Sequence, residues 1–191
     1  MKIFFLGGTF DPPHPGHYSI AKKCLEHKDC DLFIFVPCKQ NPFKNKPYFD
    51  AFDRAHILDV MCQDSDSCEL KDRIIIDSFE AQSKSKINYS IDTINYLMKE
   101  YKPSRLYMVI GQDLLESIEK WKDWNKIRKL VKIVCVNRPG YDYRTNIDIS
   151  LKIDDISIDM DSTSIRNKIK TKDWASLAKI FPRQVMDYIE R

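Results

Sequence analysis

Short apolar runs alternate along the chain with stretches in which apolar residues recur every three or four positions. The runs are rich in Ile, Val and Phe and show little polar alternation, which is typical of strands buried on both faces of a sheet. The pattern therefore predicts strands at residues 2–6, 31–37, 73–77, 105–111, 131–137 and, as the least regular run, 152–158.

Helical periodicity fills the intervals between these runs. Amphipathic helices are predicted at residues 15–28, 50–61 and 90–102. In the second of these, Asp50 can act as the N-cap. The apolar face of that helix is predicted to carry Phe52, Ala55, Leu58 and Met61.

The pattern changes from residue 161 onward, where almost all of it is helical. One helix is predicted at 162–170, a second is opened by Asp173 and Trp174, and a third has Pro182 in its first turn. Alternating strands and helices before this point indicate a parallel sheet with right-handed crossovers. We therefore expect an α/β fold, a Rossmann-like parallel sheet with helices on both faces and a helical C-terminal portion, in a single domain spanning 1–191.

Composition narrows the classes of partner. The 191 residues can bury one core, and a net charge of +3, from 31 basic and 28 acidic residues, requires neither nucleic acid nor a membrane as partner. The N-terminal apolar stretch is too short for a signal sequence or a span, so a cytoplasmic location is predicted. Six scattered cysteines without a C-x-x-C pair are expected to be free, mostly buried thiols.

The stretch GGTFDPPHPGH, residues 7–17, follows the first predicted strand directly. Proline disfavours helix in the residue before it, while Pro15 suits the first helical position. The spacing predicts that His14 lies at or near the N-cap of the next helix. His17 would then lie in the first turn of that helix.

Both histidines would lie beside free backbone N–H groups and the positive end of a helix, where phosphate is favoured. Gly7 and Gly8 would let the backbone turn sharply off the strand and approach a ligand closely. An ordinary βα connection with incidental histidines explains the spacing about as well, and a metal site lacks an evident third ligand. If the turn is functional, it is a phosphate clamp rather than a nucleophile, because no serine or cysteine with a base stands beside it.

The turn resembles the signature of the nucleotidyltransferase superfamily with the H-x-G-H motif, whose members share a Rossmann-like fold. Later segments resemble, in order, those of the bacterial nicotinate-nucleotide adenylyltransferase family. These segments are NPFK (41–44), INYSIDTI (87–94), IGQD (110–113), WKDW (121–124) and DSTSIR (161–166). The resemblance covers most of the chain, and the later segments are what narrow it beyond the superfamily.

For ATP, the resemblance implies contacts at the first turn, at the end of the fourth strand and at the start of the helix at 162–170. The expected ATP-binding residues are Gly7, Gly8, Thr9, Phe10, His17, Gly111, Asp113, Ser162, Thr163 and Arg166. The hydroxyl groups from 162 to 164 could also simply cap that helix. Asp161 stands where the family has serine, and its carboxylate would repel phosphate unless it points outward.

For the second substrate, the resemblance implies binding of nicotinate mononucleotide by Asn41, Lys44, Ser90 and Trp121. Ser90 is equally suited to be a helix N-cap. The ring of Trp121 would stack on the pyridine, and Trp124 is left to core packing. Phe43 stands where the family usually has histidine.

The implied reaction is adenylyl transfer from ATP to nicotinate mononucleotide, giving nicotinate adenine dinucleotide and pyrophosphate in NAD biosynthesis. The expected catalytic residues are His14, His17, Lys44 and Arg166. Mg²⁺ would arrive with ATP, no protein metal site is expected, and a homo-oligomer stays open. The alternatives are another small nucleotidyltransferase, such as a phosphopantetheine adenylyltransferase or a cytidylyltransferase, or a non-catalytic nucleotide-binding regulator.

Overall fold

The structure is a computed structural model that describes residues 1–40, 46–64, 68–85, 87–137, 146–154, 156 and 160–190. Within these residues six strands, all parallel, form one sheet with the order β3-β2-β1-β4-β5-β6. The strands are β1 (Lys2–Gly8), β2 (Leu32–Pro37), β3 (Ile74–Ile76), β4 (Arg105–Gly111), β5 (Lys132–Val136) and β6 (Ile149–Ile153). The predicted fold class, a Rossmann-like α/β sheet, is confirmed.

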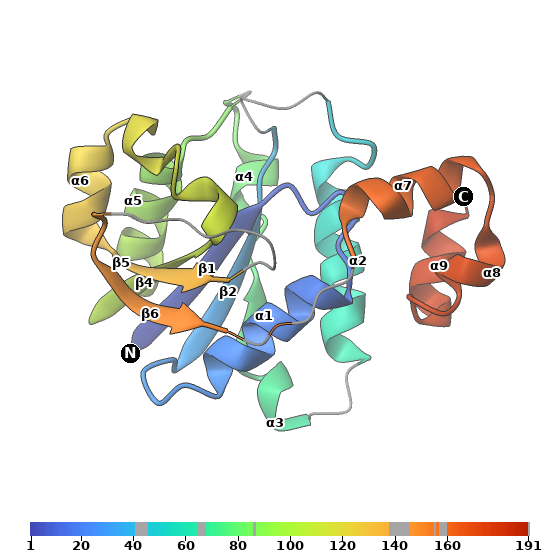
Figure 1. Ribbon diagram of the computed structural model, residues 1–191, viewed down its shortest axis with the longest axis horizontal. Helices are drawn as coiled ribbons and strands as arrows, with labels where there is room; N and C mark the ends of the chain where they lie inside the picture. Colours follow the sequence, from blue (N-terminus) through green and yellow to red (C-terminus); the bar gives the residue numbers. More distant parts are fainter. Residues whose placement is uncertain are drawn as a thin grey trace.

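Helices cover both faces of the sheet (Figure 1). The α-helices are α1 (Pro15–Leu25), α2 (Ala51–Gln63), α3 (Cys68–Lys71), α4 (Phe79–Gln82), α5 (Ser90–Tyr101), α6 (Trp124–Leu130), α7 (Ser162–Lys170), α8 (Trp174–Leu177) and α9 (Arg183–Ile189). Two 3-10 helices, η1 (Gln112–Leu114) and η2 (Ile118–Lys120), follow β4. Among the described residues, no helix is both long and apolar enough to cross a membrane.

Successive residues of β1 point to opposite faces, as the two-residue period of a strand requires. Ile3 and Phe5 pack in one apolar cluster with α5 and α6. Phe4 and Leu6 pack in a second cluster with α1 and part of α2. Burial on both faces explains why β1 reads as an uninterrupted apolar run.

The strand order reverses between β1 and β4, which are neighbours in the sheet. β1 ends at Gly8 and β4 ends at Gly111, so the two glycine-terminated ends flank the point of reversal. In open parallel sheets, ligands bind outside the carboxyl ends of the strands at this position.

The three C-terminal helices pack on α2 and not on the sheet, and in Figure 1 they lie at the far right in orange and red. Ile57 and Met61 of α2 form a third apolar cluster with residues of α7, α8 and α9. The predicted helix at 162–170 is confirmed, as is the helix opened by Asp173.

Two expectations about the elements are wrong. β6 begins three residues earlier than the predicted run at 152–158, and its residues alternate in burial because it is an edge strand with one packed face. Phe52 does not belong to the apolar face of α2, since its side chain is 57% exposed. The buried positions of α2 include Arg54 in its place.

Five of the six cysteines are shown as free thiols, as predicted. Cys24, Cys30, Cys62 and Cys135 are buried and Cys38 is half-buried. Burial raises the pKa of Cys30 and of Cys62 to about 12, so these thiols stay protonated and inert at neutral pH.

Candidate active site

The turn between β1 and α1 bends at a different residue from the one predicted from the sequence. β1 continues through Gly8, and the residue with a positive φ of 49° is Phe10. The prediction of a sharp turn at Gly7 and Gly8 is therefore wrong, because the left-handed conformation is taken by Phe10 instead. Gly8 is needed for packing: a Cβ there would lie 2.8 Å from the Phe10 ring. A Cβ at Gly7 would meet nothing within 4 Å, so the strand end is open there.

The two histidines begin α1 as predicted. His14 is the N-cap, Pro15 is the first helical residue, and His17 is the third. The backbone N–H of His14 donates to Nδ1 of His17 at 3.1 Å, and the backbone N–H of His17 donates to the His14 carbonyl at 2.8 Å. Because Nδ1 of His17 accepts this bond, the proton of its neutral ring is assigned to Nε2.

The imidazole rings are held close together at the end of the helix. Their centroids are 3.8 Å apart, and the Phe10 ring packs edge-on against His17 with 4.9 Å between centroids. The side chain of His14 is buried, with 6% exposed, while His17 is half-buried. The pair is thus fixed by the helix cap and by an aromatic neighbour.

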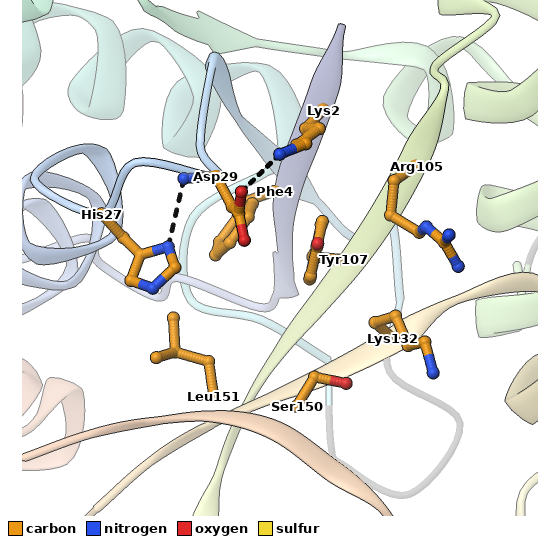
Figure 2. A pocket seen from close by; sticks show the side chains of 9 residues that line it. All are labelled: Lys2, Phe4, His27, Asp29, Arg105, Tyr107, Lys132, Ser150 and Leu151. Atoms are coloured by element: carbon orange, nitrogen blue, oxygen red, sulfur yellow. Dashed lines mark hydrogen bonds and ion pairs between the residues drawn. The ribbon is translucent and has the colours of Figure 1, made fainter.

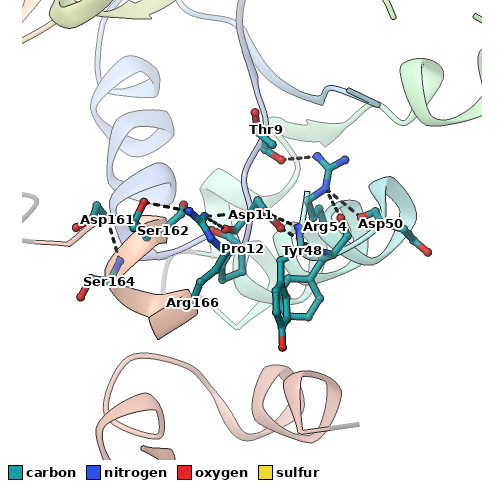
Figure 3. Close-up of polar contacts among 12 residues, drawn as sticks. Thr9, Asp11, Pro12, Tyr48, Asp50, Arg54, Asp161, Ser162, Ser164 and Arg166 are labelled. Atoms are coloured by element: carbon teal, nitrogen blue, oxygen red, sulfur yellow. Dashed lines mark hydrogen bonds and ion pairs between the residues drawn. The ribbon is translucent and has the colours of Figure 1, made fainter. Parts of the chain in front are cut away.

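The N-terminal end of α7 contacts this turn directly (Figure 3). The Ser162 hydroxyl donates to the Pro12 carbonyl at 2.9 Å. The Arg166 guanidinium donates to the Asp11 carbonyl at 2.6 Å and to the Thr163 hydroxyl at 3.0 Å. Residues predicted from two ends of the chain to bind ATP are therefore brought to one place.

Asp161, and none of the hydroxyl residues after it, is the N-cap of α7. Its carboxylate accepts the backbone N–H of Thr163 at 2.8 Å and that of Ser164 at 2.9 Å. These hydrogen bonds lower the pKa of Asp161. The cap therefore occupies two N–H groups at the end of α7 that would otherwise face an anion.

Across the strand-order reversal, Gly111 ends β4 and is the N-cap of η1. Asp113 lies in η1 and is half-buried. The ATP-binding residues predicted on β1 and on β4 thus lie at neighbouring strand ends. The structure is compatible with their binding a common ligand.

Of the four residues predicted for the mononucleotide, the structure describes Ser90 and Trp121, which lie on two neighbouring segments. Ser90 is the first residue of α5 and not its N-cap, because Tyr89 holds that position with its backbone N–H donated to Asp92 at 3.0 Å. The ammonium of Lys122 lies 4.3 Å from the centroid of the Tyr89 ring, which brings the start of α5 beside the segment of Trp121. Trp121 is half-buried.

The other residues considered for the mononucleotide site are Trp124, Asn41 and Lys44. Trp124 belongs to the core, with 8% exposed, as predicted. Asn41 and Lys44 lie outside the described residues.

Three buried polar residues near this site were not found from the sequence. The Asp11 carboxylate accepts the backbone N–H groups of Tyr48 at 2.8 Å and Phe49 at 2.9 Å. Arg54 is 0% exposed, and its place on a helix face otherwise made of apolar residues was the signal that could have found it.

Glu80 of α4 is the third of these residues and is 4% exposed. Burial raises its pKa from the ordinary 4.5 to about 7, while a hydrogen bond from the Thr93 hydroxyl and the nearby Lys39 backbone N–H act in the opposite direction. Its second carboxylate oxygen has no hydrogen-bond partner in the described part of the chain. Glu80 therefore titrates near neutral pH.

A cavity of about 500 Å³ lies elsewhere, at the amino end of the sheet (Figure 2). It is lined by Lys2, Phe4, His27, Asp29, Arg105, Tyr107, Lys132, Ser150 and Leu151. None of the residues predicted for substrate binding lines it. Its charged groups are partly neutralised, since Lys2 pairs with Asp29 and Lys132 pairs with Asp148.

Within the described ranges, no three His, Cys, Asp or Glu side chains are grouped so that they could hold a metal ion.

Comparison with known proteins identifies the family. The profile described as Cytidylyltransferase-like matches residues 5–173. A probable nicotinate-nucleotide adenylyltransferase of Aliarcobacter butzleri is 36% identical over 179 residues, covering 90% of each chain. The nicotinate-nucleotide adenylyltransferase of Bacillus subtilis is 32% identical over 190 residues, covering 99% of this chain and 95% of the relative.

Solved structures agree on the fold. The Plasmodium falciparum nicotinic acid mononucleotide adenylyltransferase complexed with NaAD matches with a TM-score of 0.80 at 20% identity, covering 98% of this chain and 93% of that one. A putative nicotinate-nucleotide adenylyltransferase from Vibrio parahaemolyticus matches with a TM-score of 0.73 at 17% identity over the full length of both chains. With sequence relatives above 30% identity along almost its whole length, the chain belongs to the cytidylyltransferase-like family and, within it, to the nicotinate-nucleotide adenylyltransferases.

Proposed function

We propose that this chain transfers the adenylyl group of ATP to nicotinate mononucleotide, releasing pyrophosphate and forming nicotinate adenine dinucleotide. The observation that carries the proposal is the junction of two helix ends at the β1–α1 turn. His14 and His17 begin α1, and Ser162 and Arg166 of α7 bond to the same turn. This junction lies at the strand-order reversal, where a nucleotide binds in sheets of this kind.

The reaction we propose is an in-line displacement. A lone pair on the 5′-phosphate oxygen of the mononucleotide forms a bond to the α-phosphorus of ATP. The bond from that phosphorus to the bridging oxygen of pyrophosphate breaks, and pyrophosphate leaves with the electron pair. No bond to the protein forms, so positioning and charge stabilisation account for the rate.

The protein groups have separate roles in this scheme. His14 is the N-cap of α1 and His17 is its third residue, with Nδ1 of His17 held by the His14 backbone N–H. In this scheme both imidazoles stabilise the transferring and leaving phosphates, His17 through the proton on its Nε2. Arg166 adds positive charge, which the Asp11 carboxylate at 3.8 Å offsets in part. Its hydrogen bonds to the Asp11 carbonyl and the Thr163 hydroxyl leave further N–H donors of the five that a guanidinium carries. Lys44, outside the described residues, is proposed to add a second positive charge.

The second substrate is assigned to the segments at Ser90 and Trp121, with Asn41 as a further contact. The Trp121 ring would stack on the pyridine. Gly7, Gly8, Thr9, Phe10, Gly111, Asp113, Ser162 and Thr163 are proposed to surround ATP. Mg²⁺ is a part of the MgATP substrate in this proposal, and the reaction is placed in the cytoplasm.

Pyrophosphate release by the pure protein tests the function. The protein is incubated with MgATP and, in separate reactions, with nicotinate mononucleotide, nicotinamide mononucleotide or phosphopantetheine, and with CTP replacing ATP. We expect rapid release with ATP and nicotinate mononucleotide. Release only with CTP or phosphopantetheine would indicate one of the related transferases. No release in any reaction would contradict an enzymatic role.

A further inference from the structure

Arg54 is a fully buried arginine that bonds only to backbone carbonyls among its described hydrogen-bond partners. Its Nη1 donates to the Thr9 carbonyl, and its Nη2 donates to Cys38 at 2.8 Å and to Lys39 at 3.3 Å. Its Nε donates to the carbonyls of Phe49 and Asp50 at 3.1 and 3.0 Å. One guanidinium therefore joins three segments that are separate in sequence.

Each of these segments borders the proposed site. Thr9 begins the turn that leads to the histidines, while Cys38 and Lys39 follow the carboxyl end of β2. The residues before α2 are held a second time, because the Asp11 carboxylate accepts the N–H groups of Tyr48 and Phe49. The turn and the segment before α2 are thus connected by two side chains running in opposite directions.

The connection reaches His17 through two contacts. Thr9 precedes Phe10, which has the positive φ of this turn, and the Phe10 ring packs against His17. Arg54 itself has no described bond to either histidine. Any influence it has on the reaction is therefore exerted through the backbone.

Stability alone is a weak reason for an arginine at this position. Desolvation of a guanidinium is costly, and apolar residues of similar volume often replace buried charged groups without loss of stability. What an apolar residue cannot do is hold carbonyl groups of three segments at fixed distances. A guanidinium does so because its N–H donors lie in one rigid plane.

We propose that Arg54 is a positioning residue for the adenylyl transfer, which sets the β1–α1 turn, and with it His17, against the end of β2. This inference rests on the proposed function. Loss of the guanidinium would let the turn shift while the helices around it stay folded. A displacement of about 1 Å at a reacting group can lower turnover about 100-fold.

The chain offers a matched control for this test. Arg73 bonds in the same manner to the carbonyls of Leu25, Cys30 and Asp31, but at the amino end of β2. Arg54→Met and Arg73→Met both remove a guanidinium that bridges carbonyls, and only the first lies beside the proposed site. Both variants are compared with the wild type by thermal unfolding and by steady-state kinetics at a temperature where all three are folded.

We expect Arg54→Met to lower kcat between about 10- and 100-fold with a smaller change in either KM, and Arg73→Met to keep the wild-type kcat. Arg54→Lys keeps the charge but cannot span the three segments, so its kcat should lie between those of Arg54→Met and the wild type. Wild-type kcat in Arg54→Met, or equal losses in both methionine variants, would overturn the proposal. If Arg54→Met does not fold, Arg54→Lys decides: a reduced kcat supports the proposal and a wild-type kcat overturns it.

A double-mutant cycle separates positioning from a general loss of order. In a His17→Ala background, Arg54→Met should lower kcat less than threefold, because the group that it positions is already absent. An undiminished loss in that background would show that Arg54 acts independently of His17. Lack of activity in the wild type would instead contradict the proposed function.

Discussion

The two ends of the sheet carry similar side chains in different arrangements. The amino end has the cavity of about 500 Å³, with partly exposed ion pairs between side chains, such as Lys2 with Asp29. The carboxyl end has the buried side chains of Asp11 and Arg54, which bond mainly to backbone groups, and the buried N-cap residue His14. Asp11 also pairs with Arg166, with 3.8 Å between Oδ2 and Nη1. Exposed pairs are screened by salt and contribute little, whereas groups fixed to the backbone are preorganised for a ligand. The hollow at the amino end is therefore a weaker sign of function than the hydrogen bonding at the carboxyl end.

The largest expected effect comes from replacing one histidine at each end of the sheet and comparing the loss of kcat. His17→Ala should lower kcat by about 10²–10³, because it removes one preorganised contact to the transferring phosphate. It should cost only about 1 kcal/mol of unfolding free energy, the value of a lost helix-cap bond. Steady-state pyrophosphate release and urea unfolding measure the two quantities.

The control is His27→Ala, which changes a histidine that lines the cavity at the amino end. Its kcat should equal that of the wild type. A loss of kcat in His27→Ala as large as that in His17→Ala would contradict the assignment of the reaction to the carboxyl end of the sheet.

The buried carboxyl of Glu80 and a carboxyl at the amino end should differ in how they make the free energy of unfolding depend on pH. Its pKa is raised to about 7 in the folded chain, so folding favours the protonated form. The resulting stabilisation is fully present below pH 4.5 and is lost as pH rises through 7, by up to roughly 3 kcal/mol. Unfolding in guanidinium chloride should be measured for the wild type and Glu80→Gln at pH 5 and pH 8. From pH 5 to pH 8, the unfolding free energy of the wild type should fall relative to that of the variant.

Asp29 provides a partly exposed carboxyl at the amino end for comparison. Its hydrogen bond from Lys2 lowers its pKa, so any stability it contributes is lost only as pH falls through the acid range. Asp29→Asn should therefore leave the change between pH 5 and pH 8 as it is in the wild type. An equal change in wild type and Glu80→Gln would show that Glu80 does not titrate in this range.

Asp161 gives the smallest of the expected effects. Asp161→Ser keeps a capping side chain but removes a negative charge near the proposed phosphate site, so the KM for ATP should fall about threefold. Kinetics with ATP varied at low ionic strength measure this. Asp29→Ser, which removes a carboxylate at the amino end, should not change that KM. An increased KM in Asp161→Ser would mean that the carboxylate supports ATP binding.

The sequence was sufficient to predict how strands and helices alternate along the chain and where the two histidines lie. Apolar runs covered on both faces and the prolines before α1 are local signals, and they located β1 and the N-cap His14 correctly. β6 was misplaced because an edge strand shows only half of the apolar pattern. The sharp bend was assigned to glycines because a positive φ is rare for a residue such as Phe10.

Long-range polar contacts could not be predicted. The bonds of Arg54 reach from α2 back to Thr9, and nothing near either residue in sequence indicates the other. An arginine on an apolar helix face does indicate that a buried partner exists, but it does not identify that partner. The cap at Asp161 was similarly uncertain, since the three hydroxyl residues after it are equally good caps by type.

The contacts from α7 to the β1–α1 turn have a consequence for the order in which the site is completed during translation. Ser162 lies 150 positions after Pro12, and Arg166 lies 155 positions after Asp11. On the ribosome, the turn emerges among the first residues, yet it acquires these two contacts only after α7 has left the exit tunnel. A nascent chain stopped before residue 162 would carry both histidines and lack the hydroxyl and the guanidinium that bond to the turn between β1 and α1.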